Sequence, residues 1–357
     1  MNPFAAALLL VWMPALLAQD QAPTPTPPVV WSPDLASTLA QARTAHQPTL
    51  VFFTASWCVP CKQLKEQVCG TPEFATAFRD HAFAMIDIDR DRAAAQAWQV
   101  GPIPDLRFVD ATGEELGGFV GNRSLAGVLQ ARDAALQSGE RATALRAAVE
   151  KTPNDAAAQL LLAEHLLLRP NKQPGVAWLQ RAILADAENQ QGIAARAHWL
   201  SIGATFQVLG RASSEDIASA QQRLERLDHF PKNDTTAIYA EAARAWLAWT
   251  ETMRAWSELR RDAQHKDDRL AVADDAPLRQ TLSRLCAAAT RPQSPAADAA
   301  ADGLLISGLL HYYAGDYPTG VARLTEFTDR YPTHRWHGEG LRFRGIAQRL
   351  RDQGDKK

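Results

Sequence analysis

The stretch TLVFFTASWCVPC, from Thr49 to Cys61, constrains the fold of this 357-residue chain more than any other. The unbroken apolar run at residues 50–53 predicts a buried strand, and the charged segment that follows Cys61 predicts a helix. This order delivers the pair Cys58 and Cys61 to a first helical turn, where unpaired N–H groups and the helix dipole favour negative charge. A thiolate is stabilised there and becomes a usable nucleophile near neutral pH. Pro60 suits that turn because its missing N–H costs nothing.

A second motif lies about forty residues further along, where VGPIP at residues 100–104 precedes a strand-like LRFV. Together with WCVPC, it resembles the thioredoxin family, and the resemblance covers roughly residues 29–136. In that family a cis-proline faces the two cysteines, which implies that Pro104 is cis. The resemblance also implies that Trp57, Pro60, Ile103 and Pro104 wall the site and present a backbone edge to a substrate chain.

The active-site run resembles two subgroups of this family. WCVPC is similar to membrane-anchored bacterial thioredoxins of the TlpA kind, and SWCVPCKQLKEQV with the TPEF after it is similar to the C-terminal domain of DsbD, a periplasmic electron-transfer protein. The resemblance implies that Cys58 is the nucleophile and that Cys61 is the thiol that resolves a mixed disulfide. It implies no cofactor other than the Cys58–Cys61 disulfide.

One position departs from the family pattern. Thioredoxins usually carry a buried acid six positions before the first cysteine, where this chain has Phe52. The DsbD domain also has an acid on the helix, at the position occupied here by Lys65, with Glu66 beside it. The usual proton acceptor for the resolving thiol is therefore missing, and a solvent-mediated route or Glu66 would have to serve.

Metal binding is the main alternative for the cysteine pair. A zinc site would need Cys58 and Cys61 together with Cys69 and His81, and no second Cys-x-x-Cys or His-x-His cluster supports it. Cys69 and Cys286 are each predicted to be small buried apolar residues, although a bridge between them stays open. His334 and His337 have no carboxylate partner in their motif, so a surface patch is favoured over a metal site.

The N-terminal residues predict export. The apolar stretch at residues 4–17, interrupted by Pro14, is short for a membrane span and typical of a signal peptide. We expect a signal peptide at residues 1–18, a Pro/Thr-rich linker at 19–28 and a periplasmic location. An uncleaved membrane anchor is the alternative.

The two remaining parts of the chain differ in composition. Residues 29–137 predict an α/β thioredoxin fold, with strands at 29–31, 49–54, 83–88, 106–109 and 115–120 and helices at 34–45, 60–68, 72–79, 91–98 and 124–136. From residue 138 to 357 strand signals vanish and apolar residues recur at helical spacing. Gly308, Leu324 and Pro332 fit a tetratricopeptide-like (TPR-like) repeat, Gly175 and Leu179 fit a second, and Trp199 and Phe206 fit a third. An all-α helical-repeat domain is therefore expected.

These features favour an exported thiol–disulfide oxidoreductase that acts on protein substrates, takes electrons from an unidentified donor and holds a protein partner on its repeat domain. The alternative is a chaperone-like or scaffold protein in which the thioredoxin fold is regulatory or vestigial. A net charge of −2 gives no basic footprint for nucleic acid. Whether the pair would act as a reductase or an oxidase stays open.

Overall fold

The computed structural model describes residues 29–205, 212–265, 267–271, 276–290, 294 and 296–354. The expected signal peptide and linker lie outside these residues. Phe206, which we assigned to the third repeat, and the turn after it also lie outside them.

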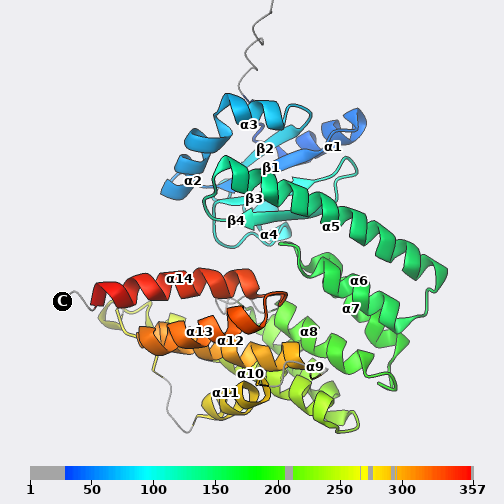
Figure 1. Ribbon diagram of the computed structural model, residues 1–357, viewed down its shortest axis with the longest axis vertical. Coiled ribbons are helices and arrows are strands. Elements are labelled where there is room, and N and C mark those ends of the chain that lie inside the picture. The colour runs from blue at the N-terminus through cyan, green and yellow to red at the C-terminus, as the bar shows by residue number, and fades with distance from the viewer. Residues whose placement is uncertain are drawn as a thin grey trace, which may run out of the picture.

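A four-stranded mixed sheet forms the centre of the N-terminal domain (Figure 1). The strands are β1 (Thr49–Thr54), β2 (Ala82–Asp87), β3 (Asp105–Val109) and β4 (Glu115–Val120). They are arranged in the order β2-β1-β3-β4, with β1 parallel to β2 and the other neighbouring pairs antiparallel. The four strands expected from residue 49 onward are confirmed to within one residue at each end. This domain is thus an α/β thioredoxin fold.

Alternation along β1 gives the sheet two apolar faces. Leu50 and Phe52 point into one cluster with the disulfide, and Val51 and Phe53 point into the other. The first face is covered by α2 (Val59–Leu64), α3 (Pro72–Ala77) and α5 (Leu125–Lys151), and the second by α1 (Leu35–Ala45) and α4 (Arg92–Ala97). Every residue of β1 from Thr49 to Phe53 is buried, as expected for a central strand.

Two expected elements differ in the structure. The strand expected at residues 29–31 is absent, because the segment pairs with the sheet only through an isolated bridge between Ser32 and Ala84. Val30 is 83% exposed. The helix expected to end at residue 136 continues to Lys151 as α5, and Figure 1 shows it leading from the sheet domain to the helical region. Its buried residues recur at a spacing of seven across the expected domain boundary, namely Val128, Ala135, Ala142 and Val149.

The region after α5 is all-helical among its described residues. It contains α6 (Ala156–Leu166), α7 (Gln173–Ala185), α8 (Ile193–Thr205), α9 (Ser214–His229), α10 (Asp234–Leu259), α11 (Pro277–Ala288), α12 (Ala297–Ala314), α13 (Tyr317–Arg330) and α14 (His337–Gly354). Successive helices pack as hairpins, most closely where glycines occur. A Cβ at Gly175 would lie 2.9 Å from the backbone nitrogen of Leu167, and one at Gly308 would lie 2.6 Å from Cγ of Leu324. These are two of the small positions that suggested TPR-like repeats.

None of the helices in the described parts of the chain combines the length and the apolar character needed to span a bilayer.

Candidate active site

The two cysteines of the motif form a disulfide at the start of α2. Cys58 is the N-cap residue of this helix, and its Sγ accepts a hydrogen bond from the backbone N–H of Cys61 at 3.2 Å. Both cysteines are buried, Cys58 at 3% exposure and Cys61 at 1%. An N–H aimed at Sγ stabilises negative charge on that atom once the disulfide is reduced.

The four residues expected to wall the site differ in how far they are exposed to solvent. The Ile103–Pro104 peptide bond is cis, which confirms the conformation expected for Pro104. Pro104 is buried, whereas Ile103 is half-buried and packs against the cluster that contains the disulfide. Trp57 and Pro60 are exposed, and the neighbouring Val59 is 60% exposed. The disulfide therefore lies beneath an apolar rim, although the roles of these residues remain predictions.

Trp57 is held in place by a residue that the sequence analysis did not single out. Its indole Nε1 donates a hydrogen bond to Oδ2 of Asp89 at 2.8 Å, while 63% of the side chain stays exposed. Thr54 and Asp87 are paired at the ends of the parallel strands β1 and β2. Residues that follow those two ends lie at one edge of the sheet, a signal from which Asp89 could have been found.

Among the described residues, no buried carboxylate replaces the missing one on the face of the sheet that carries Cys61. Phe52 is fully buried in the apolar cluster that contains both cysteines, and Glu66 is exposed on the short π-helical turn Lys65–Cys69 that follows α2. Asp105 is buried close to the motif, but it lies opposite Phe53 in the register of β1 and β3. Its side chain therefore belongs to the other face of the sheet.

A buried ion cluster begins directly after Pro104. Arg107 donates from Nε and Nη2 to the two carboxylate oxygens of Asp105, each at 2.6 Å, and from Nη1 to Oε2 of Glu115 at 2.7 Å. All three side chains are at most 8% exposed. Gly118 lies opposite Arg107 in β4, where a Cβ would come within 2.2 Å of the Leu106 carbonyl oxygen. The glycine leaves room for the backbone of β3 and for Cδ of Arg107, which lies 3.0 Å from that position.

The same cluster joins the sheet to the helical region. Oε1 of Glu115 accepts the backbone N–H of Asn171 at 3.0 Å, and Nη1 of Arg169 donates to the Glu115 carbonyl oxygen at 2.6 Å. Nearby, the backbone N–H of Lys172 donates to Oε1 of Gln99 at 2.9 Å. Because Gln99 directly precedes the VGPIP segment, the loop between α6 and α7 contacts both the proline loop and β4.

Glu114 adds a second link between the domains. Arg146 of α5 and Arg169 each donate to its Oε1, at 2.8 and 2.5 Å. Burial alone would raise the pKa of Glu114, but these hydrogen bonds and the two positive charges hold it below its ordinary value. The carboxylate is thus stabilised in its charged form between the two domains.

The remaining cysteines are free, and Cys69 packs in the same apolar cluster as the disulfide. Cys69 is buried as expected, and burial raises the pKa of its thiol to about 12. Cys286 is half-buried, and burial also raises its pKa. Neither takes part in a bridge with the other.

The structure gathers no metal cluster at the positions that were weighed. Within the described ranges, no group of three or more His, Cys, Asp or Glu residues could hold a metal ion. Burial, together with the charge of Arg132, lowers the pKa of His81 to about 4. The expected surface patch is wrong for His334, which is buried with its Nε2 3.1 Å from the Asp298 carbonyl oxygen and 3.4 Å from Oδ1 of the buried Asp302. His337 is half-buried, with its Nε2 3.2 Å from the Thr328 carbonyl oxygen.

Fold and site together define a thioredoxin-like domain with a Cys-x-x-Cys disulfide. A family model described as thioredoxin-like matches residues 30–111. Over 102 residues the chain is 32% identical to the thiol:disulfide interchange protein DsbD of Vibrio vulnificus, a match that covers 28% of this chain and 16% of that protein. The chain therefore spans about one sixth of the length of that relative.

Other relatives give the same assignment. Thioredoxin H2-1 of Oryza sativa is 39% identical over 82 residues, covering 22% of this chain and 56% of that protein. The TPR repeat-containing thioredoxin TDX of the same species is 32% identical over 90 residues, covering 25% and 27%. Among solved structures, thioredoxin from Trichomonas vaginalis is 31% identical with a TM-score of 0.25, covering 31% of this chain and 97% of that one.

Proposed function

We propose that this protein is an exported thiol–disulfide oxidoreductase that exchanges disulfides with protein substrates through Cys58 and Cys61. The observation that carries the proposal is the disulfide at the N-terminus of α2, beneath an apolar rim and beside a cis-proline loop. The likeness to proteins named thioredoxin and thiol:disulfide interchange protein supports it.

The chemistry is two-step exchange. The Cys58 thiolate attacks one sulfur of a substrate disulfide, forming a mixed disulfide and releasing the other substrate sulfur as a thiolate. The Cys61 thiolate then attacks Sγ of Cys58, which restores the Cys58–Cys61 disulfide and releases the second substrate thiol. Two electrons pass from the protein to the substrate, so each further turnover as a reductase needs an external dithiol donor. In the opposite direction the same steps oxidise a substrate dithiol.

Export and partner binding complete the proposal. The apolar N-terminal stretch supports cleavage after Ala18 and release into the periplasm. The helical region would hold a protein partner, since helical repeats of this kind stack into extended binding surfaces. Mass spectrometry of the chain produced in a Gram-negative host should find Gln19 at the N-terminus. An intact Met1 would instead support an uncleaved anchor.

Cysteine variants test the redox chemistry directly. Cys58→Ser should abolish reduction of insulin disulfides by dithiothreitol-driven turnover, whereas Cys61→Ser should accumulate mixed disulfides that survive non-reducing electrophoresis. Cys69→Ser is the matched control and should retain full turnover, because Cys69 is a free thiol that takes no part in the disulfide. The proposal is wrong if the Cys58→Ser protein still reduces insulin.

The direction of electron flow follows from the reduction potential of the Cys58–Cys61 pair. Equilibration in glutathione or dithiothreitol buffers, read by the fluorescence change of Trp57, would measure it. A value near about −270 mV, as in thioredoxin, would mean a reductase, and one near about −120 mV, as in DsbA, would mean an oxidant.

A second candidate function is a holdase, a chaperone that binds unfolded proteins without redox chemistry. Phe52 favours it, because the buried carboxylate that usually assists the resolving thiol is absent here. A protein with both Cys58 and Cys61 replaced by serine should then suppress aggregation of a heated client as well as the unmodified chain does. Loss of that suppression on replacing the cysteines would exclude this function.

A further inference from the structure

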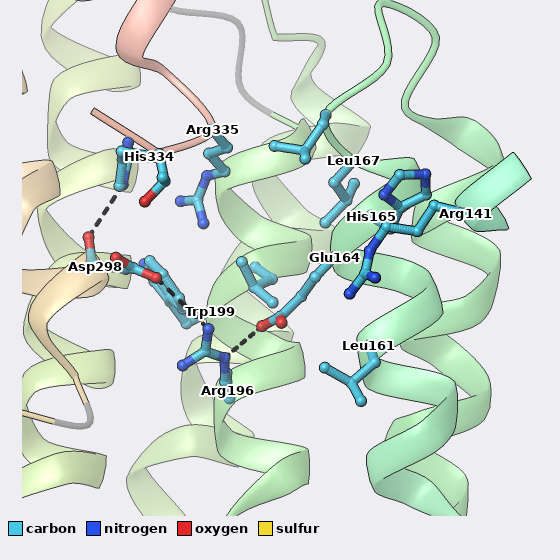
Figure 2. A pocket seen from close by; sticks show the side chains of 13 residues that line it. Arg141, Leu161, Glu164, His165, Leu167, Arg196, Trp199, Asp298, His334 and Arg335 are labelled. Atoms are coloured by element: carbon cyan, nitrogen blue, oxygen red, sulfur yellow. Dashed lines mark hydrogen bonds and ion pairs between the residues drawn. The ribbon is translucent and has the colours of Figure 1, made fainter. Parts of the chain in front are cut away.

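The helical region contains a cleft of about 250 Å³ that the redox site does not use (Figure 2). It lies between α6 and α8 and is closed by α5 on one side and by the turn at residues 333–335 on another. We call it the α6–α8 cleft.

One part of this cleft is apolar and exposed. Leu161 and Leu168 line it with 54% and 58% of their surface accessible, although the neighbouring Leu160, Leu162 and Leu166 are buried. Large aliphatic side chains that stay accessible beside a cleft mark an interaction surface when they occur together. This part of the cleft can therefore accept an aliphatic side chain.

The other part of the cleft is cationic. Arg141 is exposed and has no hydrogen-bonding or ion-pairing partner among the described residues. Arg335 is only 8% exposed, stacks on Trp199 with its guanidinium carbon 4.3 Å from the ring centre, and has a buried Nε without a partner. Figure 2 shows that Arg141 and Arg335 enter the cleft from different elements.

Around the cleft, Glu164 and Asp298 pair with Arg196, and Asp302 pairs with Arg335. Of the three arginines that line the cleft, only Arg141 has no carboxylate partner among the described residues. Nε of Arg196 lies 2.5 Å from Oε1 of Glu164. The buried Asp302 accepts hydrogen bonds from Nε1 of Trp199 and from Nη2 of Arg335. Burial lowers the pKa of His165 on the cleft wall, and the charges of nearby arginines, Arg141 among them, lower it further. Arg141 is thus the cation of the cleft that is available for an incoming anion.

The size of the cleft restricts its ligand. Pockets that enclose a drug-sized molecule span about 300–1,000 Å³, so a cleft of about 250 Å³ accommodates only part of a larger ligand. One aliphatic and one acidic side chain of an extended polypeptide match both its size and its two surfaces. A polypeptide ligand also agrees with a redox site whose rim is apolar and exposed.

We propose that the α6–α8 cleft binds an extended segment of the protein substrate, with an aliphatic side chain against Leu161 and Leu168 and an acidic side chain against Arg141. This rests on the proposed function, since it takes the occupant to be the protein whose disulfide is exchanged. The cleft would raise the local concentration of that protein at the redox site.

Binding of a defined peptide tests the cleft without any redox chemistry. The probe is a short fluorescein-labelled peptide of alternating glutamate and leucine, acetylated and amidated, titrated with the full chain in fluorescence anisotropy. Arg141→Glu should raise its Kd by about tenfold or more, because an ion pair is replaced by repulsion. Leu161→Ser should also raise the Kd. Peptides with glutamine for glutamate, or serine for leucine, should bind more weakly than the probe.

Matched variants exclude general effects of charge and hydrophobicity. Arg349→Glu changes an equally exposed arginine on α14, and Leu184→Ser changes an exposed leucine on α7, both outside the cleft. Neither should change the Kd by more than about twofold. Equal effects of Arg141→Glu and Arg349→Glu, or equal binding of the glutamine peptide, would overturn the proposal. Dissociation of an oligomer by Arg141→Glu, without peptide binding, would show a second copy as occupant and overturn it as well.

A redox comparison separates this inference from the proposed function. Arg141→Glu should leave the reduction of a small disulfide such as oxidised glutathione unchanged. If the unmodified chain binds the probe but reduces no disulfide, the cleft stands and the redox proposal fails. If it reduces insulin but shows no specific peptide binding, the redox proposal stands and the cleft fails.

Discussion

Removing Arg107 should destabilise the sheet domain more than any exposed arginine could. Its guanidinium makes three short hydrogen bonds to Asp105 and Glu115, and all three side chains are nearly inaccessible to water. Arg107→Met keeps most of the apolar stem and removes the charge. Two carboxylates then remain buried with no cation between them, which is the costly way to break a buried ion pair.

The structure sets the expected size of this effect. Removing one partner of a buried pair costs about 3–5 kcal/mol, so the urea midpoint should fall by about 1.5–2.5 M for a slope of about 2 kcal/mol per M. The comparison pair is Arg79 and Asp80, which are 3.7 Å apart and 73% and 83% exposed. Arg79→Met should cost no more than about 1 kcal/mol, as exposed pairs do.

Hydrogen exchange followed by mass spectrometry across a urea series is the suitable assay, because peptides from β1 and β3 report on the sheet separately from the helices. A triple variant, Asp105→Val, Arg107→Met and Glu115→Gln, is the internal control. It removes every charge, keeps an acceptor for the N–H of Asn171 and should recover part of the lost stability. A midpoint for Arg107→Met that matches that of Arg79→Met would refute the reasoning.

Three further predictions concern single side chains. Cys69 should stay unmodified by iodoacetamide at pH 8 in the native protein, because it is 1% exposed and its thiol pKa is raised to about 12. Burial lowers the pKa of His198 to about 4, so the unfolded chain gains this proton first and stability falls as the pH drops from about 6.5 to 4, by about 3 kcal/mol at most. His198→Phe, which keeps a ring beside Phe230, should reduce that loss in urea titrations at pH 7 and pH 4.5. Asp89→Ala should free the Trp57 indole and lower the tryptophan fluorescence anisotropy relative to the unmodified chain, because Trp57 is the one exposed tryptophan among the described residues.

Each of these has a clear contrary result. Rapid alkylation of Cys69 in the folded chain would show that the apolar cluster opens readily. An acid-side loss that is identical in His198→Phe and the unmodified chain would assign it to other groups, such as His81. An unchanged anisotropy in Asp89→Ala would show that packing alone positions Trp57.

The sequence was sufficient where the determining contacts are local. The strand Thr49–Thr54 follows from its apolar run, and the hairpin strand Glu115–Val120 follows from alternation around a turn. The helix start at Cys58 follows from a proline in its first turn. The cis bond before Pro104 came from the family resemblance and not from local physics.

The sequence was insufficient where a contact joins distant residues. Arg107 and Glu115 looked like ordinary charges of a hairpin, and nothing near either residue shows that Asn171 completes their cluster 56 positions after Glu115. The expected domain boundary was drawn where composition changes, yet α5 crosses it because its buried stripe continues through Ala142 and Val149. Composition describes what a segment contains, whereas helix length is decided by what each successive turn packs against.

Phe52 is a position where part of the answer comes from the sequence and part from the register of the strands. Sequence comparison shows that a carboxylate is missing there, but only the register of β1 and β3 shows that Asp105 does not replace it. Asp105 lies opposite Phe53, on the face away from Cys61, and both its oxygens are already bound by Arg107. The other buried acids among the described residues are Glu115, which pairs with Arg107, and Asp186 and Asp302, which lie at the end of α7 and on α12 in the helical region. With no buried carboxylate on that face among the described residues, we expect a proton that leaves Cys61 to pass to water, to the exposed Glu66 or to the departing substrate sulfur. The resolving step then depends on how the bound substrate closes the apolar rim.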